Sequence, residues 1–193
     1  MEKIIKELNE IFEKADGRAL RITSIPNENH KPACNDNRYI VAGFPGTGKS
    51  YAGSQFPDEF IDMESSDYHW RIQYGTVTKK ELDPNWPNNY LDVIEGTYRN
   101  AELTGTILCI CCSTHAEVLR GLKDRGLHFI AICPKDKEET IRRYKERGND
   151  EAFIENLNKN FNNFRNDVLN SPADMVICTD KYISDVMSYF AHC

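Results

Sequence analysis

Apolar and polar residues alternate along this chain in blocks that predict strands and helices in turn. Short apolar runs indicate buried strands at residues 38–42, 59–63, 107–112, 129–133 and 175–178. Between and after them, apolar residues recur at helical spacing in segments 49–55, 90–103, 116–125, 137–147, 151–169 and 183–190. This alternation predicts βαβ units, and therefore an α/β fold with a five-stranded parallel sheet covered by helices on both faces.

The first part of the chain has a different pattern. Apolar residues at helical spacing between residues 2 and 15 predict an amphipathic helix that ends near Gly17. The proline- and asparagine-containing segment 23–37 is expected to be a loop. We therefore expect an N-terminal helix and linker over residues 1–37, followed by one domain over residues 38–193.

Composition narrows the class of protein. The 193 residues, 40% of them hydrophobic, are enough for one sizeable core. A net charge of −6 gives no electrostatic footprint for nucleic acid or an anionic membrane, so neither is expected as a partner. We expect a cytoplasmic location, because no apolar stretch approaches the roughly 20 residues that span a bilayer and the N-terminus lacks a signal peptide's apolar core.

The seven cysteines are expected to be reduced and structural. Their number is odd, and most of them lie in apolar runs that predict buried strands. The cluster Cys109-x-Cys111-Cys112 has no second ligand pair at zinc spacing, so we do not expect a zinc site.

The most specific pattern is Gly-Phe-Pro-Gly-Thr-Gly-Lys-Ser at residues 43–50, a complete G-x-x-x-x-G-K-[ST] motif between an expected strand and an expected helix. In this motif, backbone N–H groups wrap a phosphate, the lysine neutralises β/γ-phosphate charge and the serine hydroxyl reaches Mg²⁺. The motif predicts nucleotide binding. The residues expected to contact the nucleotide are Gly43, Pro45, Gly46, Thr47, Gly48, Lys49, Ser50 and Tyr51.

Other positions argue against two classes of phosphate-loop protein. GTPases need an Asn/Thr-Lys-x-Asp motif, whereas Thr179-Asp180-Lys181 has the wrong order. Large ATPases usually end the third strand with an acidic partner for Mg²⁺. Here the run 107–112 continues into Ser113-Thr114-His115.

An acidic pair, Asp62-x-Glu64, follows the second expected strand instead. The carboxyl ends of parallel strands border the ligand crevice, so both carboxylates are expected to face the phosphate loop. Asp62 could hold a water of Mg²⁺, as a metal-site residue beside Ser50, and take the proton of an acceptor oxygen. The alternative is a solvated acidic loop at a strand end.

Two arginines follow the fourth expected strand. Arg143 and Arg147 are four residues apart, which places them on one face of a helix, and Gly148 and Asn149 then permit a hinge. Arginines on a mobile segment can neutralise the charge of a phosphoryl group during transfer. We therefore expect a short lid over about residues 140–152. The alternative is an ordinary solvated helix whose arginines pair with Glu138, Glu139 and Glu146.

Together, these motifs resemble the nucleoside monophosphate kinase and shikimate/gluconate kinase group of P-loop kinases over about residues 38–190. The resemblance implies a three-layer sandwich with strand order 2-3-1-4-5, ATP and Mg²⁺ as cofactors, and an acceptor-binding insert at about 64–100. It also implies catalytic roles for Lys49, Asp62, Arg143 and Arg147. Adenylate kinases carry Asp-Gly-x-Pro-Arg after the third strand, where this chain has Ser113 to Glu117, so an atypical, phage-type nucleotide kinase fits better.

The acceptor region mixes polar and aromatic residues. Arg71 and Arg99 are expected to pair with an acceptor phosphate, and Glu64 and His115 are further candidates for substrate contacts. A helix cap would explain His115 equally well. Four aromatic side chains could stack on a nucleobase or simply pack in the core: Trp70, Tyr74, Trp86 and Tyr90.

Three functions remain open from the sequence. The leading hypothesis is an ATP-dependent nucleoside monophosphate kinase, with a nucleotide as its small-molecule acceptor. The second is a P-loop kinase that acts on another hydroxyl, in a small metabolite or at a polynucleotide end. The third is a non-catalytic ATP-binding regulatory module. The sequence does not predict the oligomeric state.

Overall fold

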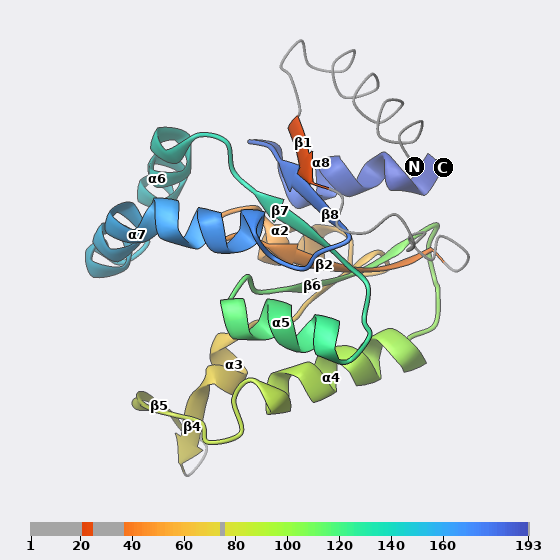
Figure 1. The fold of residues 1–193 in the computed structure, drawn as a ribbon, viewed down its shortest axis with the longest axis horizontal. Coiled ribbons are helices and arrows are strands. Elements are labelled where there is room, and N and C mark those ends of the chain that lie inside the picture. The colour runs from red at the N-terminus through yellow and green to blue at the C-terminus, as the bar shows by residue number, and fades with distance from the viewer. Residues whose placement is uncertain (1–20, 25–36, 74–75, 193) are drawn as a thin grey trace.

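The computed structural model describes residues 21–24, 37–73 and 76–192. The amphipathic helix expected at residues 2–15 lies outside these residues, as does Tyr74. The centre of the molecule is a six-stranded sheet (Figure 1). Its strands, in chain order, are β1 (Arg21–Ser24), β2 (Arg38–Gly43), β3 (Phe60–Asp62), β6 (Leu108–Cys112), β7 (Phe129–Cys133) and β8 (Met175–Cys178).

Strand order in the sheet is β1-β8-β7-β2-β6-β3. Strands β2, β3, β6, β7 and β8 are parallel. When these five are renumbered 1 to 5 in chain order, their order across the sheet is 2-3-1-4-5. The whole sheet differs from the predicted five-stranded one because β1 adds a sixth strand, antiparallel to β8. Residues 23–24 were expected in a loop. The pairing of β1 covers the edge of β8, whose backbone N–H and C=O groups would otherwise lack strand partners on that side.

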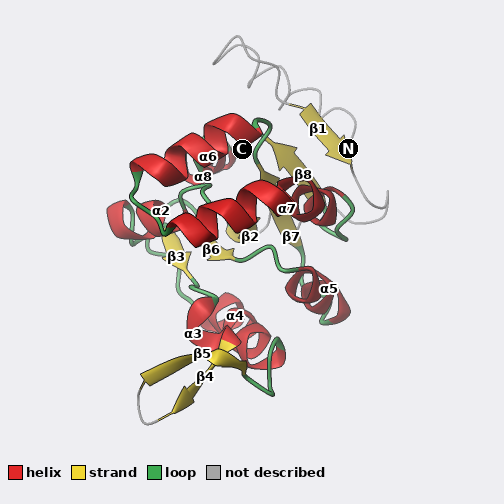
Figure 2. Ribbon diagram, turned by 90° about the vertical axis from the view of Figure 1, so that its left-hand side faces the viewer, coloured by secondary structure: helices red, strands yellow, loops and turns green. Residues whose placement is uncertain are grey.

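Helices cover both faces of the sheet, as Figures 1 and 2 show. The helices are α2 (Lys49–Gln55), α3 (Ser66–His69), α4 (Asn88–Asn100), α5 (Ala116–Asp124), α6 (Lys137–Glu146), α7 (Glu151–Leu169) and α8 (Ile183–Ser188), followed by the 3-10 helix η1 (Phe190–His192). A separate hairpin consists of β4 (Trp70–Gln73) and β5 (Thr76–Leu82). Of the described helices, none is long and apolar enough to cross a membrane.

Alternating side chains of the strands supply two buried clusters. In β2, Ile40 and Ala42 belong to the cluster that packs against α4, α5 and α7, whereas Val41 belongs to the cluster that packs against α2 and α8. The sheet is therefore buried on both sides, which explains why its strands are continuous apolar runs rather than alternating ones. Three layers result, as predicted.

The strand register determines which residues meet at the carboxyl edge of the sheet. Ala42 pairs with Cys112, and Asp62 pairs with Cys111. Gly43, at the end of β2, pairs with Ile132. The segments that follow β2, β3 and β6 therefore leave the sheet at the same edge, and this edge carries the candidate site.

Candidate functional site

The loop between β2 and α2 is tightly shaped by two glycines. Gly46 and Gly48 have φ angles of 83° and 86°, in the left-handed region that favours glycine. A Cβ atom on Gly46 would lie 2.8 Å from the ring of Tyr144, and one on Gly48 would lie 2.9 Å from the ring of Tyr182. Both glycines are therefore needed for backbone conformation and for close packing against these tyrosines.

Backbone hydrogen bonds hold this loop against the rest of the sheet. The amide of Phe44 donates to the carbonyl of Ile132 in β7 (2.8 Å), and the amide of Ile183 in α8 donates to the carbonyl of Thr47 (2.8 Å). The buried Thr47 hydroxyl donates inward to the carbonyl of Phe44 (2.7 Å). The loop is thus held by β7, by α8 and by a hydrogen bond of its own.

Lys49 and Ser50 begin α2. The Lys49 ammonium donates to the carbonyl of Gly43 at 2.8 Å, which folds the side chain back over the loop. Ser50 is exposed, and the side chain of Tyr51 is also exposed, beside Tyr182 at 6.4 Å between ring centroids. The loop residues that the sequence predicted therefore lie together, with the lysine and the serine in the first turn of α2.

Asp62 ends β3 at the same edge. Its Oδ1 atom is buried and has no hydrogen-bond partner among the described residues. A Cβ atom on Gly53 would lie 3.3 Å from the Asp62 Cβ, so the aspartate packs against α2. Glu64 is exposed, and its carboxylate accepts a hydrogen bond from the amide of Ser66 (3.1 Å). A buried carboxylate oxygen without a partner is energetically unfavourable, which is typical of functional positions.

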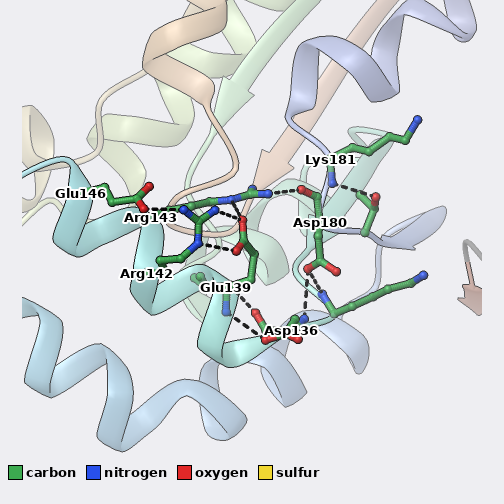
Figure 3. A network of polar contacts seen from close by, with 10 residues as sticks. Asp136, Glu139, Arg142, Arg143, Glu146, Asp180 and Lys181 are labelled. Atoms are coloured by element: carbon green, nitrogen blue, oxygen red, sulfur yellow. Dashed lines mark hydrogen bonds and ion pairs between the residues drawn. The ribbon is translucent and has the colours of Figure 1, made fainter. Parts of the chain in front are cut away.

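Arg143 lies on α6 and points toward the phosphate loop. Its Nε donates to Glu139 at 2.8 Å, and its Nη2 donates to the carbonyl of Asp180 (Figure 3). Its guanidinium carbon is 4.6 Å from the centroid of the Tyr182 ring. Arg147, just beyond α6, is exposed and makes no side-chain hydrogen bond or ion pair with the described residues. The structure thus brings Arg143 to the loop and leaves Arg147 at the surface.

Asp180 connects the loops that follow β7 and β8. Its carboxylate accepts hydrogen bonds from the amides of Lys135 and Asp136, both at 3.0 Å (Figure 3). Asp136 in turn caps α6 by accepting from the amide of Glu139 (2.9 Å). The sequence had presented Asp180 only as part of a mismatched GTPase motif. In the structure its carboxylate binds the residues just before α6 and its carbonyl binds Arg143 of α6, so Asp180 holds this helix beside the phosphate loop.

A column of stacked rings lies after β3. His69 stacks on Trp70 and on Trp86, each at 4.5 Å between centroids, and Trp86 also stacks with Tyr90 at 5.5 Å. Tyr90 is fully buried, and its hydroxyl donates to the carbonyl of Met63 (2.6 Å). Tyr90 and Trp86 are therefore engaged by protein neighbours. Packing, the alternative interpretation of these aromatic residues, accounts for both.

His115 joins this column edge-on. Its ring lies 5.2 Å from that of His69 and 5.4 Å from that of Trp86, at steep interplanar angles of 78° and 82°. Its Nδ1 lies 3.0 Å from the Ser113 hydroxyl oxygen, and the Trp86 indole N–H donates to Glu117 (2.9 Å). His69 was not predicted as a site residue. It immediately precedes Trp70, but no motif marked it.

The two imidazoles share a low proton affinity. Burial lowers the pKa of His69, and Glu117 partly opposes the shift. Burial also lowers the pKa of His115; Glu117 is the strongest opposing influence, His69 and then Lys49 lower the pKa further, and Glu64 weakly raises it. Both rings are therefore neutral at pH 7, and His115 lies within electrostatic reach of the phosphate-loop lysine.

The two arginines expected to bind an acceptor phosphate are not brought together. Arg71 is exposed on the β4–β5 hairpin and pairs with Glu81 at 3.2 Å. Arg99 pairs with Glu95 at 2.8 Å near the end of α4, and its carbonyl accepts from Arg38. Arg38 starts β2, so Arg99 lies at the opposite edge of the sheet from the phosphate loop.

Within the described parts of the chain, no group of three or more His, Cys, Asp or Glu side chains forms a metal site. Ser50 and Asp62 remain the residues that could contribute to a Mg²⁺ ion held mainly by phosphate oxygens. The five described cysteines are buried thiols. Burial raises the pKa of Cys112 to about 12, which makes it a poor nucleophile.

No protein-family model and no curated protein matches the sequence. Solved structures do: the tunicamycin resistance protein of Deinococcus radiodurans is 19% identical, with 80% of this chain and 93% of that chain covered and a TM-score of 0.50. A gluconokinase from Sinorhizobium meliloti 1021 is 14% identical, with 81% of this chain and 90% of that chain covered and a TM-score of 0.48. At such low identity the first likeness shows a shared fold, and the predicted α/β P-loop fold class is confirmed.

Proposed function

We propose that this protein is a phosphotransferase that uses a nucleoside triphosphate, with ATP as the expected donor. The observation that carries the proposal is one sheet edge that holds both a glycine-shaped loop with Lys49 and the buried, unpartnered carboxylate oxygen of Asp62. The first feature suits a triphosphate, and the second suits removal of a proton from an acceptor. A module that only binds a nucleotide has no need of a group that removes a proton from an acceptor.

The loop residues have distinct roles in this proposal. The backbone amides around Gly46 and Gly48 would hold the β-phosphate, as the amides of this motif do in phosphate loops. Lys49 would leave the carbonyl of Gly43 and pair with the β- and γ-phosphates. Mg²⁺, when bound through Ser50 and phosphate oxygens, would neutralise negative charge on the phosphates.

Arg143 and Asp62 would act on opposite sides of the transferred group. Arg143 lies beside the loop and is held there by Glu139 and the carbonyl of Asp180. At this position its positive charge would favour binding of the donor phosphates. Asp62 would accept the proton of an attacking hydroxyl, or orient the acceptor if that acceptor is itself a phosphate. Arg147 is exposed, so its role depends on movement of the short segment after α6.

The expected acceptor is a small molecule that binds between α3, the end of β6 and the start of α5. The resemblance to nucleoside monophosphate kinases favours a nucleoside monophosphate as the acceptor. The resemblance to shikimate and gluconate kinases favours an alcohol. Both acceptors fit transfer from a phosphate loop, and both require Lys49.

A transfer assay with γ-labelled ATP, Mg²⁺ and a panel of nucleosides, nucleotides and small alcohols tests this proposal. Lys49→Ala should reduce transfer by at least about a hundredfold, because a preorganised positive charge on the γ-phosphate is lost. Lys145→Ala, which removes an exposed lysine of α6, is the matched control and should change the rate less than about twofold. ATP binding without transfer to any acceptor would contradict the proposal and favour a regulatory module.

A further inference from the structure

Tyr144 occupies the space that a side chain at Gly46 would need. It belongs to α6, which lies beside α7 (Figure 2), and its ring centroid is 5.2 Å from that of Phe153 in α7. A Cβ atom on Gly46 would lie 2.8 Å from Cε2 of the Tyr144 ring and 3.4 Å from the Tyr144 hydroxyl oxygen. The tip of this tyrosine, with its hydroxyl, therefore lies against the backbone of the phosphate loop.

The Tyr144 hydroxyl has no hydrogen-bond partner within the part of the chain that the structure describes, although only 5% of the residue is exposed. Among the same residues, the side-chain oxygens that are fully enclosed without a partner are Asp62 Oδ1 and Ser171 Oγ. Because the Tyr144 hydroxyl is not one of these enclosed atoms, it is open to solvent. The hydroxyl of a buried tyrosine normally contacts a hydrogen-bond partner. An open hydroxyl at a phosphate loop therefore indicates a partner that is a ligand.

The two neighbouring residues Arg143 and Tyr144 contact the loop at different places. Arg143 lies over the ring of Tyr182, and that ring packs against Gly48. Tyr144 packs against Gly46, two residues earlier in the loop. The start of α6 is held by its Asp136 cap, so both side chains are presented by one fixed helix. The Tyr144 hydroxyl is thus positioned before a nucleotide arrives.

The chemistry of the hydroxyl suits a phosphate oxygen. Burial raises the pKa of Tyr144, while Arg147 opposes the shift and Glu64 adds to it. The hydroxyl therefore keeps its proton at neutral pH and can donate it in a hydrogen bond. Phosphate oxygens are strong acceptors of such bonds. Glu64 leads into α3, where the acceptor is proposed to bind, so its influence agrees with a hydroxyl on the acceptor side of the loop.

We propose, on the basis of the phosphotransferase function above, that the Tyr144 hydroxyl donates a hydrogen bond to an oxygen of the γ-phosphate. The γ-phosphate is the part of the donor that faces the acceptor, and the hydroxyl lies on that side of the loop. A nucleoside diphosphate has no γ-phosphate, so it gains nothing from this contact. Tyr144 thereby favours binding of the triphosphate over the diphosphate, and loss of the contact after transfer favours release of the product.

Tyr144→Phe tests the inference, because it removes the hydroxyl and keeps the ring. Calorimetric titration with Mg²⁺, without an acceptor, measures the affinities for ADP and for the non-hydrolysable β,γ-imido analogue of ATP. We expect the Kd of the triphosphate analogue to rise by about tenfold, because a hydrogen bond to a charged group is lost. The Kd of ADP should change less than about twofold. Equal changes for both nucleotides, or no change for either, would overturn the inference.

Tyr98→Phe is the matched control. Tyr98 lies near the end of α4, where its carbonyl accepts a hydrogen bond from Arg38 at the start of β2, away from the phosphate loop. Its variant should leave both affinities unchanged within about twofold. If Tyr98→Phe weakened binding of the triphosphate analogue as much as Tyr144→Phe does, the contrast would not come from the loop and the inference would fail.

Thermal melting separates a ligand-binding hydroxyl from a structural one. Since the Tyr144 hydroxyl has no partner among the described residues, Tyr144→Phe should leave the melting midpoint unchanged or slightly higher. A clearly lower midpoint would identify a structural hydroxyl and would overturn the inference.

The inference and the proposed function can fail separately. If the unmodified protein binds the triphosphate analogue but transfers phosphate from ATP to no acceptor, the phosphotransferase function fails. The two affinities still decide whether Tyr144 contacts the γ-phosphate, because they are measured without transfer. If transfer occurs and Tyr144→Phe affects both nucleotides alike, only the role of Tyr144 is overturned.

Discussion

The guanidinium of Arg143 lies over the ring of Tyr182, with its central carbon 4.6 Å from the ring centroid. Tyr182 packs closely against Gly48, so the arginine of α6 is linked to the phosphate loop through one aromatic ring. Cation–π contacts of this kind contribute about 0.5–2 kcal/mol. With the hydrogen bonds of Arg143 to Glu139 and Asp180, the contact makes α6 part of the wall of the loop.

Arg143→Ala should therefore weaken use of the nucleotide. We expect kcat/KM for ATP to fall by about tenfold or more, since a positive charge and the packing of Tyr182 are both lost. Arg142→Ala is the matched control, because Arg142 is an exposed arginine that pairs with Glu139 and Glu146. Steady-state kinetics would count against this role for Arg143 if the two variants behaved alike.

Asp62→Asn separates chemistry from stability. Loss of the proton acceptor should lower kcat by about a hundredfold, while the affinity for ATP measured without Mg²⁺ should be unchanged. Because Asp62 Oδ1 is buried without a partner, removal of its charge should leave the free energy of unfolding equal or slightly higher. Urea denaturation and ATP titration check both expectations. A large loss of stability would show that Asp62 is a structural residue.

The glycines of the loop can be tested against a glycine elsewhere. Gly46→Ala places a Cβ 2.8 Å from the Tyr144 ring at a positive φ, so we expect about 1–3 kcal/mol of destabilisation and loss of ATP binding. Gly96 lies within α4 with no neighbour within 4 Å of an added Cβ. Gly96→Ala should stabilise the protein by about 0.5–1 kcal/mol. Calorimetric melting of both variants measures these changes in stability, and equal changes in the two variants would contradict the prediction.

Stability should depend on pH through the two imidazoles. Burial lowers the pKa of His69 and His115 below the ordinary histidine value of about 6.5, so near and below that pH the unfolded chain binds more protons than the folded one. The free energy of unfolding should be fully retained above about pH 7 and should decrease as the pH falls through 6.5.

Urea denaturation between about pH 5.5 and 8 measures this slope. The double variant His69→Gln, His115→Gln should have a shallower dependence in this range, because both titrating groups are removed. An unchanged slope would mean that other groups dominate the proton uptake on unfolding.

Local patterns were sufficient for most elements. The helix Glu151–Leu169 and the strands Phe129–Cys133 and Met175–Cys178 agree with the predicted bounds, because their apolar periodicity is long or uninterrupted. The strand β1 was missed because its four residues carry little pattern and are paired only through β8. The β4–β5 hairpin was missed for a similar reason, since its polar residues resemble a loop.

The candidate site divides in the same way. The phosphate loop and Asp62 were predicted because a motif and a strand end determine their positions locally. Tyr144, Tyr182 and His69 were not predicted, and Arg99, expected to bind the acceptor, lies at the end of the sheet away from the phosphate loop. No local rule states which side chains distant in sequence will be adjacent.

The pattern of the chain predicted a phosphate-binding loop and the alternation of strands and helices, because both depend on neighbouring residues and on the period of apolar positions. The assembled fold alone shows that Arg143 contacts Tyr182, that Asp62 has a buried oxygen without a partner among the described residues, and that His69 and His115 share one cluster. Burial, ring stacking and pKa shifts depend on contacts between segments far apart in the chain. Such contacts exist only after the sheet has assembled.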